Sequence, residues 1–212
     1  MNRQNILFLI ALPLFFTQGL SQDKNPTNLS IGFGHYTYFK ATWFKNRFYD
    51  YTEIAPSITY DIPLTHSLSI NTKLFYLNHK SESFFESSIN SFNRILLVNV
   101  GNATLIEYFL MPRLNYNFYR FENISLFARI GLAIGYIKTN YTSYYYYGIY
   151  NNTSGPFFVF GAAGGFGIKN KITNSPITLF ITVDSHYAYR GEQSVDPEYD
   201  GILLDFGVGY DL

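Results

Sequence analysis

Three consecutive residues, Asp184, Ser185 and His186, are of the types that hydrolases combine for nucleophilic catalysis. They lie in a segment, 177–190, in which apolar and polar residues alternate as in a β-strand. Adjacent side chains of a strand point to opposite faces, so Ser185 cannot reach His186 within this segment. Asp184 and His186 share a face, and we expect a buried polar pair there rather than a catalytic one.

The glycine-rich stretch from Gly161 to Gly167 could suggest a phosphate-binding loop. It lacks the Lys-Ser/Thr pair of such loops and opens no helix, so it indicates a strand with one face free of bulky side chains. The chain has no cysteine, which excludes disulfides and thiol nucleophiles. We therefore assign no catalytic, cofactor-binding or metal-binding residue, and we expect no cofactor.

Ionisable side chains gather on the polar faces of several alternating segments. Burial of these faces would require the charges to pair with one another, so we predict a salt-bridge network. The whole chain has 15 basic and 15 acidic residues and a formal net charge of zero, which argues against a nucleic-acid partner. The predicted network consists of Glu107, Arg113, Arg129, Asp184, His186, Arg190 and Asp205.

The elements that must position these residues are eight alternating segments. Most are longer than the roughly 5–6 residues of an ordinary strand. They also match the about 9–11 tilted residues that a strand needs to cross the hydrocarbon of a membrane. The segments are 29–39, 53–62, 68–76, 104–118, 124–138, 157–169, 177–190 and 201–212.

The last segment, 201–212, is the most informative of the eight. Leu204, Phe206, Val208 and Tyr210 share one face, and small or acidic residues such as Asp205 share the other. Lipid can cover such an apolar face, and only a closed barrel can carry strands across a bilayer. Small inward residues suit the narrow interior of eight strands. The sequence therefore predicts an all-β fold, an eight-stranded antiparallel up-and-down transmembrane β-barrel.

The connecting segments alternate between long and short. The long ones are 40–52, 79–103, 139–156 and 191–200, and the short ones are 63–67, 119–123 and 170–176. Membrane barrels have short turns on the periplasmic side and long loops outside, so both termini are expected on the periplasmic side. Within 79–103, residues 95–100 are either a hairpin arm beyond the membrane, which we favour, or a ninth strand that turns at Gly101-Asn102.

Two residues fit the alternating strand pattern poorly. His35 falls on the lipid-facing side of its strand, which suggests a bulge or a later strand start. Pro112 lacks a backbone donor inside a strand.

The loop at 139–156 is rich in tyrosine and is interpreted as a rim of the outer aromatic belt, or alternatively as a surface-interaction loop. Its tyrosines are Tyr141, Tyr144, Tyr145, Tyr146, Tyr147 and Tyr150.

The first residues are typical of a secretory signal peptide. Arg3 supplies the positive charge, residues 6–16 are apolar apart from the break at Pro13, and Gly19 to Ser21 are suited to cleavage. We expect a signal peptide at 1–21 and the barrel domain at 22–212. The apolar run is too short to span a bilayer, although an uncleaved anchor helix is the alternative.

Together these features resemble the outer-membrane-protein β-barrel domain family of Gram-negative bacteria, with its OmpX/OmpA-type small barrels. The resemblance also rests on the stretch from Ile106 to Pro112 and on the terminal Phe206-Gly-Val-Gly-Tyr210 strand. It implies a location in the outer membrane and contact with outer-membrane lipid. It also implies insertion by the barrel-assembly machinery, which often reads a terminal Phe or Trp where this chain has Leu212.

The function that we expect is non-enzymatic: a small structural or surface-exposed barrel, monomeric, with a closed lumen and loops presented outside. A small channel and a lipid A-modifying enzyme are the alternatives. A soluble lipocalin-like barrel is the rival at the level of the fold, and it would place the apolar faces inside.

Overall fold

The computed structural model of the chain describes residues 26–38, 53–81, 84–89, 95–145, 148–189 and 199–212. These residues form nine strands. The strands are β1 (Asn28–Tyr38), β2 (Glu53–Pro63), β3 (Leu68–Ser81), β4 (Phe84–Ile89), β5 (Ile95–Phe121), β6 (Ile124–Tyr145), β7 (Gly148–Lys171), β8 (Ile177–Tyr189) and β9 (Tyr199–Asp211).

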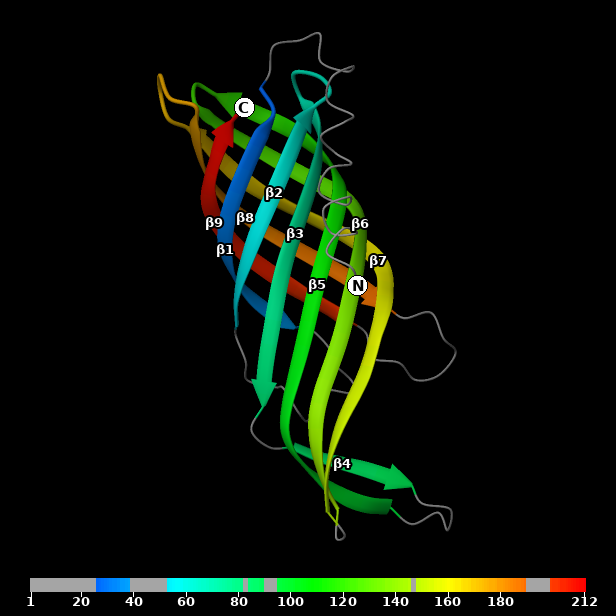
Figure 1. Cartoon of the computed structure of the whole chain (residues 1–212). Helices are drawn as coiled ribbons and strands as arrows, with labels where there is room; N and C mark the ends of the chain where they lie inside the picture. Colours follow the sequence, from blue (N-terminus) through cyan, green and yellow to red (C-terminus); the bar gives the residue numbers. More distant parts are fainter. Residues whose placement is uncertain (1–25, 39–52, 82–83, 90–94, 146–147, 190–198) are drawn as a thin grey trace.

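Eight of these strands close into a barrel (Figure 1). Each pairs antiparallel with its neighbours in the order β3-β2-β1-β9-β8-β7-β6-β5, and β3 pairs with β5 to complete the ring. The ninth strand, β4, pairs with β5 and is not part of the ring. The predicted eight-stranded antiparallel barrel is confirmed.

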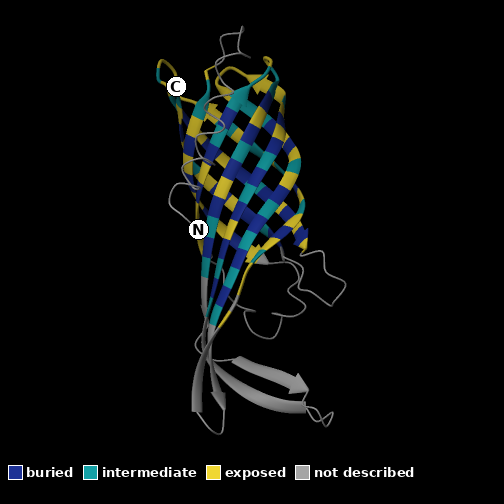
Figure 2. Cartoon of the chain, turned by 45° about the vertical axis from the view of Figure 1, so that its right-hand side comes forward, coloured by how far each residue is buried: buried dark blue, intermediate teal, exposed yellow. Residues whose placement is uncertain are grey.

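Along the described parts of the barrel strands, most exposed or partly exposed positions alternate with buried ones (Figure 2). The apolar outward residues include Ile130, which is 71% exposed, and Val208, which is 45% exposed. The charged inward residues include Arg129, which is 6% exposed, and Asp205, which is fully buried. The apolar faces therefore point away from the lumen, the reverse of a lipocalin-like arrangement.

The two ends of the barrel differ. The short-turn end holds the three tight connections at 64–67, 122–123 and 172–176 together with Leu212 (Figure 1). The opposite end, called the loop end below, is where β5, β6 and β7 continue beyond the ring. Within the described turns, Glu122 and Asn174 have positive φ, a conformation that tight turns require.

Two predictions about the connecting segments need correction. The segment 139–156 was expected to be a loop, yet β6 extends to Tyr145 and β7 begins at Gly148, and the two strands pair throughout this region. Their aromatic and β-branched residues favour an extended sheet over a loop. Gly101-Asn102 is not a turn, because β5 runs through it with a register shift against β6. Residues 95–100 pair with 84–89 and form the hairpin arm that was favoured.

Neither of the two poorly fitting residues, His35 and Pro112, shifts the register of its strand at its position. His35 points outward near the loop end of β1, and the pairing of β1 with β2 and β9 shows no register shift, so the predicted bulge is absent there. Pro112 pairs with Thr72 of β3, while the ladder between β5 and β6 skips Met111 and Pro112 and resumes in the same register. The predicted signal peptide, 1–21, lies outside the described residues.

Candidate functional site: a charged layer and an aromatic layer in the lumen

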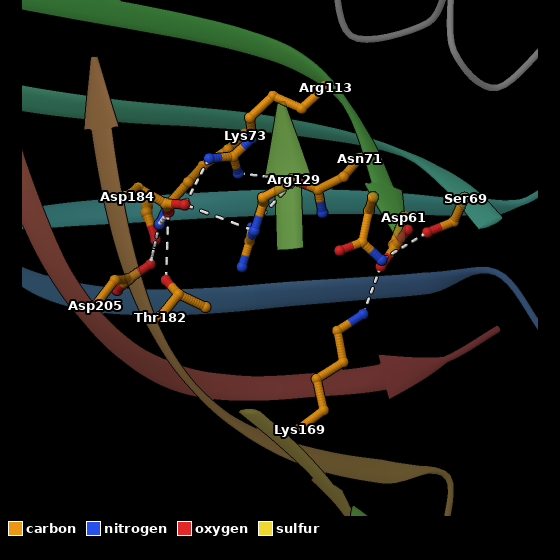
Figure 3. Close-up of polar contacts among 12 residues, drawn as sticks. Asp61, Ser69, Asn71, Lys73, Arg113, Arg129, Lys169, Thr182, Asp184 and Asp205 are labelled. Carbon is orange, nitrogen blue, oxygen red and sulfur yellow. Dashed lines mark hydrogen bonds and ion pairs between the residues drawn. The ribbon is translucent and has the colours of Figure 1, made fainter. Parts of the chain in front are cut away.

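Asp184 of β8 is the centre of a buried ion cluster in the lumen (Figure 3). Its Oδ2 lies 2.8 Å from Lys73 Nζ, and its Oδ1 lies 2.7 Å from Arg113 Nη1. Arg129 Nε lies 3.5 Å from the same Oδ1. The three cations come from β3, β5 and β6, so one carboxylate ties four strands together.

Asp205 of β9 extends this cluster. Its Oδ2 lies 2.5 Å from Lys73 Nζ and accepts a hydrogen bond of 2.8 Å from Ser57 Oγ of β2. Asn71 completes it, because its Oδ1 accepts from Arg113 Nη2 at 2.7 Å and from Arg129 Nη1 at 3.1 Å. Lys73, Arg113, Arg129, Asp184, Asp205, Ser57 and Asn71 are called the charged layer below.

The charged layer spans the lumen from wall to wall. Lys73 lies on β3 and Asp184 on β8, and three strands separate β3 from β8 in either direction around the ring. Charges taken out of water cost several kcal/mol each unless they are paired and hydrogen-bonded. Each charge of this layer has an ion-pair partner, while Arg113 Nε, Arg129 Nε and Asp205 Oδ1 have no hydrogen-bond partner among the described residues. Gly32 makes room for this layer, since a Cβ on it would lie 2.6 Å from Asp205 Oδ1.

An aromatic layer lies next to the charged layer on its loop-end side. It consists of Tyr36, Phe75, Phe109 and His186, which belong to β1, β3, β5 and β8. The rings of Phe75 and Phe109 stack with centroids 5.2 Å apart, and His186 lies 4.3 Å from the Phe109 centroid. Tyr36 Oη and His186 Nε2 form a hydrogen bond of 3.1 Å.

The structure places the sequence-predicted network residues in different surroundings. Arg113, Arg129, Asp184 and Asp205 meet in the charged layer. His186 instead belongs to the aromatic layer, where its polar contact is Tyr36. Glu107 is fully buried on β5, beyond Phe109 toward the loop end. Arg190 lies outside the described residues.

Sequence reasoning missed several members of the charged layer. Lys73 bridges both aspartates, and Asn71 and Ser57 complete the hydrogen bonding. All three sit on the inward side of their strands, so the alternation pattern already carried the signal. It could not single them out as partners of Asp184, because β2 and β3 lie far from β8 in the sequence.

The short-turn end opens into a polar cavity of about 260 Å³. Two ion pairs line it, Lys169–Asp61 at 2.5 Å and Lys171–Asp211 at 2.7 Å. A small void of about 20 Å³ lies deeper, between Asp61 and Arg129, and is large enough for one water molecule. The charged layer therefore has space for one water molecule beside Asn71 and Arg129, on its short-turn side.

The two chemical alternatives raised by the sequence find little geometric support. Ser185 is exposed on the outer face of β8, whereas His186 points into the lumen, so the two side chains lie on opposite sides of the wall. The stretch from Gly161 to Gly167 lies in β7, where a Cβ on Gly161 or Gly167 would meet the backbone of β8. It is a barrel wall that packs closely, as a strand rich in glycine allows.

The tyrosine-rich segment is described only in part. Tyr141, Tyr144 and Tyr145 lie on β6 and Tyr150 lies on β7, in the part of the sheet that extends past the ring. Tyr146 and Tyr147 lie outside the described residues. In the described ranges, no group of three or more His, Asp and Glu side chains could hold a metal ion. Among those same residues, no helix has the length and apolarity to cross a membrane.

The closed ring, the apolar outer face and the charged interior define a β-barrel of the membrane-spanning class. Comparison of structures supports this assignment. The chain is similar to the outer membrane protein OprG of Pseudomonas aeruginosa, with a TM-score of 0.52 and 10% identity over 88% of this chain and 95% of that one. No protein-family model matches the sequence, and no curated protein is significantly similar to it.

Two further solved structures are similar at lower scores. The outer membrane protein W of Escherichia coli has a TM-score of 0.45 and 13% identity over 91% of this chain and 100% of that one. Ail, the attachment invasion locus protein of Yersinia pestis, has a TM-score of 0.46 and 12% identity over 87% of this chain and 97% of that one. The similarity to OprG shows that the chain has the fold of small outer-membrane β-barrels, as the sequence resemblance implied.

Proposed function

We propose that the chain is a small integral barrel of the bacterial outer membrane, structural or surface-exposed, whose lumen is closed to ions. The short-turn end faces the periplasm and the loop end faces outward, following the usual arrangement of such barrels. The extended strands β5, β6 and β7 then carry the long connections to the cell surface, where they are available for interaction with an extracellular ligand.

The observation that carries the closed lumen is the pair of layers inside it. An ion crossing the barrel would have to separate Lys73 and Arg113 from Asp184, which are buried partners at 2.8 and 2.7 Å. It would then have to pass the packed rings of Phe75 and Phe109, which offer no polar group in place of hydration water.

Planar-bilayer recording of the purified, refolded full chain tests the closed lumen. We expect no stable conductance steps under conditions in which a conducting porin, recorded as a positive control, opens readily. Stable large steps from the wild-type barrel would favour the small-channel alternative and would overturn this part of the proposal.

The proposal assigns no catalytic role. His186 contacts Tyr36 and Phe109 inside the wall, and Ser185 faces the other way, so these two side chains are not arranged as a base and a nucleophile for acyl transfer. Lipid A from cells that express wild type or His186→Phe should therefore have the same mass spectrum. A species that depends on His186 would support the lipid-modifying alternative.

The proposal also includes a monomer in direct contact with outer-membrane lipid, inserted by the barrel-assembly machinery. The outward apolar residues Phe206, Tyr210 and Leu212 on and after the last strand support this assignment. Heat-modifiable gel migration and extraction only by detergent are the expected behaviour of the mature protein. Release of the folded protein without detergent would contradict the membrane location.

A further inference from the structure

The ladder between β2 and β3 ends early, at Pro56. It runs from Pro63↔Ser69 to Ser57↔Phe75 and goes no further in the described pairing. Beyond this point β2 continues beside β1 as far as the pair Tyr36↔Glu53, and β3 continues beside β5. Proline has no backbone N–H to donate, which is a physical reason for the ladder to stop there.

An apolar groove of about 310 Å³ lies on the outer face at this point. One row of paired side chains, Ile31, Ile58 and Leu74, borders it toward the short-turn end. In the next row toward the loop end, the small Pro56 ring lies beside the larger Phe33 ring. The groove therefore exists because a short side chain lies between larger ones.

Two tyrosines border the groove toward the loop end. Tyr76 and Tyr108 are paired across β3 and β5 with ring centroids 4.9 Å apart. The row continues through Tyr136 and Phe158 on β6 and β7. Aromatic rows of this kind lie at the level of lipid headgroups, because one end of the tyrosine ring is apolar and the other is polar.

We propose that this groove, called the Pro56 groove below, holds one acyl chain of an outer-leaflet lipid, a lipid A chain. The groove is continuous with the lipid-facing belt, since Phe33 and Ile58 are 54% and 51% exposed on its walls. Among the described residues, no charged side chain lines it. Its tyrosines lie toward the loop end, so the headgroup belongs on that side, in the outer leaflet. The inference rests on the proposed outer-membrane location.

Native mass spectrometry of the barrel, extracted from outer membranes in mild detergent, tests this site. We expect wild type to retain one lipid A molecule. Pro56→Phe fills the groove, and Ile31→Trp fills it from β1 with Pro56 intact. Each should lower retained lipid A by about tenfold, the loss expected when about 1.4 kcal/mol of contact is removed.

Two control variants separate filling of the groove from other effects. Ala162→Phe adds the same side chain to the exposed outer face of β7, away from the groove, and should retain lipid A. Pro56→Ala restores the backbone N–H without filling the groove and should also retain it. Heat-modifiable migration of each variant shows that the barrel folded. Recovery of the protein in the outer-membrane fraction tests the proposed location independently of lipid retention.

Four results would overturn the lipid A site. They are wild type free of lipid, wild type with phospholipid alone, a second copy of the chain in place of lipid, and equal retention by wild type and both filled variants. If Pro56→Phe does not fold, Ile31→Trp decides the matter by the same measurement.

Discussion

The two layers of the lumen fill the same narrow space with opposite chemistry. The charged layer holds three cations and two carboxylates that are nearly or fully buried and directed at one another. The aromatic layer holds Tyr36, Phe75, Phe109 and His186, whose contacts are mostly ring against ring. Asp184 and His186 are successive inward-facing residues of β8, so the charged layer and the aromatic layer are adjacent along this strand.

Because of this difference, we expect the two layers to respond differently to the loss of a side chain. Removal of one partner from the charged layer leaves another buried charge without compensation, which costs more than the pair itself contributed. Removal of one ring from the aromatic layer leaves a cavity whose walls can partly relax. The charged layer is also next to the cavity at the short-turn end, whereas the aromatic layer separates it from the loop end.

Asp184→Ala should have the largest effect on stability. It leaves Lys73, Arg113 and Arg129 facing one another with Asp205 as the remaining carboxylate of the layer. We expect a loss of about 3–5 kcal/mol in the free energy of unfolding, the cost of breaking a buried pair. Urea titration followed by heat-modifiable gel migration measures it. A loss below about 1 kcal/mol would mean that water already compensates these charges.

Phe109→Ala should cost about 3 kcal/mol, because a fully buried ring is removed between Phe75 and His186. The charged layer stays intact in this variant, so planar-bilayer recordings should remain silent. Stable conductance steps from this variant would show that the aromatic layer alone closes the lumen.

Gly32→Ala should cost about 1–3 kcal/mol, the usual penalty for adding volume to a packed interior. Its Cβ would lie 2.6 Å from Asp205 Oδ1 and 2.9 Å from Ser57 Oγ, so the charged layer must shift. Gly164→Ala is the matched control, since the nearest atom to its Cβ is 3.5 Å away. Equal stability of the two variants in the same titration would contradict tight packing around Asp205.

Lys171→Ala should have the smallest effect, below about 1 kcal/mol, because half-exposed ion pairs contribute little. Lys171 Nζ lies 2.7 Å from Asp211 Oδ2 at the short-turn end, and its side chain is 50% exposed. Any loss should shrink further at high salt, where exposed charges are screened. A larger loss of stability that does not depend on salt would mean that this pair contributes as the buried pairs of the charged layer do.

Much of the barrel could be read from the alternation of residue types. The exposed Ile130 and Leu132 and the buried Arg129 and Asp205 follow directly from that period of two. The extended hairpin at 139–156 was missed, because its polar and aromatic residues do not alternate clearly and their length suggested a loop. The Pro56 groove was also missed, since Pro56 fits the outward pattern and only the register shows that pairing stops there.

The sequence by itself determined which face of each strand points outward and which points into the lumen, because that property is local and repeats every second residue. Only the tertiary structure decided that Lys73 of β3 pairs with Asp184 of β8, and that His186 lies among rings rather than among charges. The physical reason is the stagger of a closed barrel. Strand tilt and shear set which inward residues share a level, and these depend on the ring as a whole.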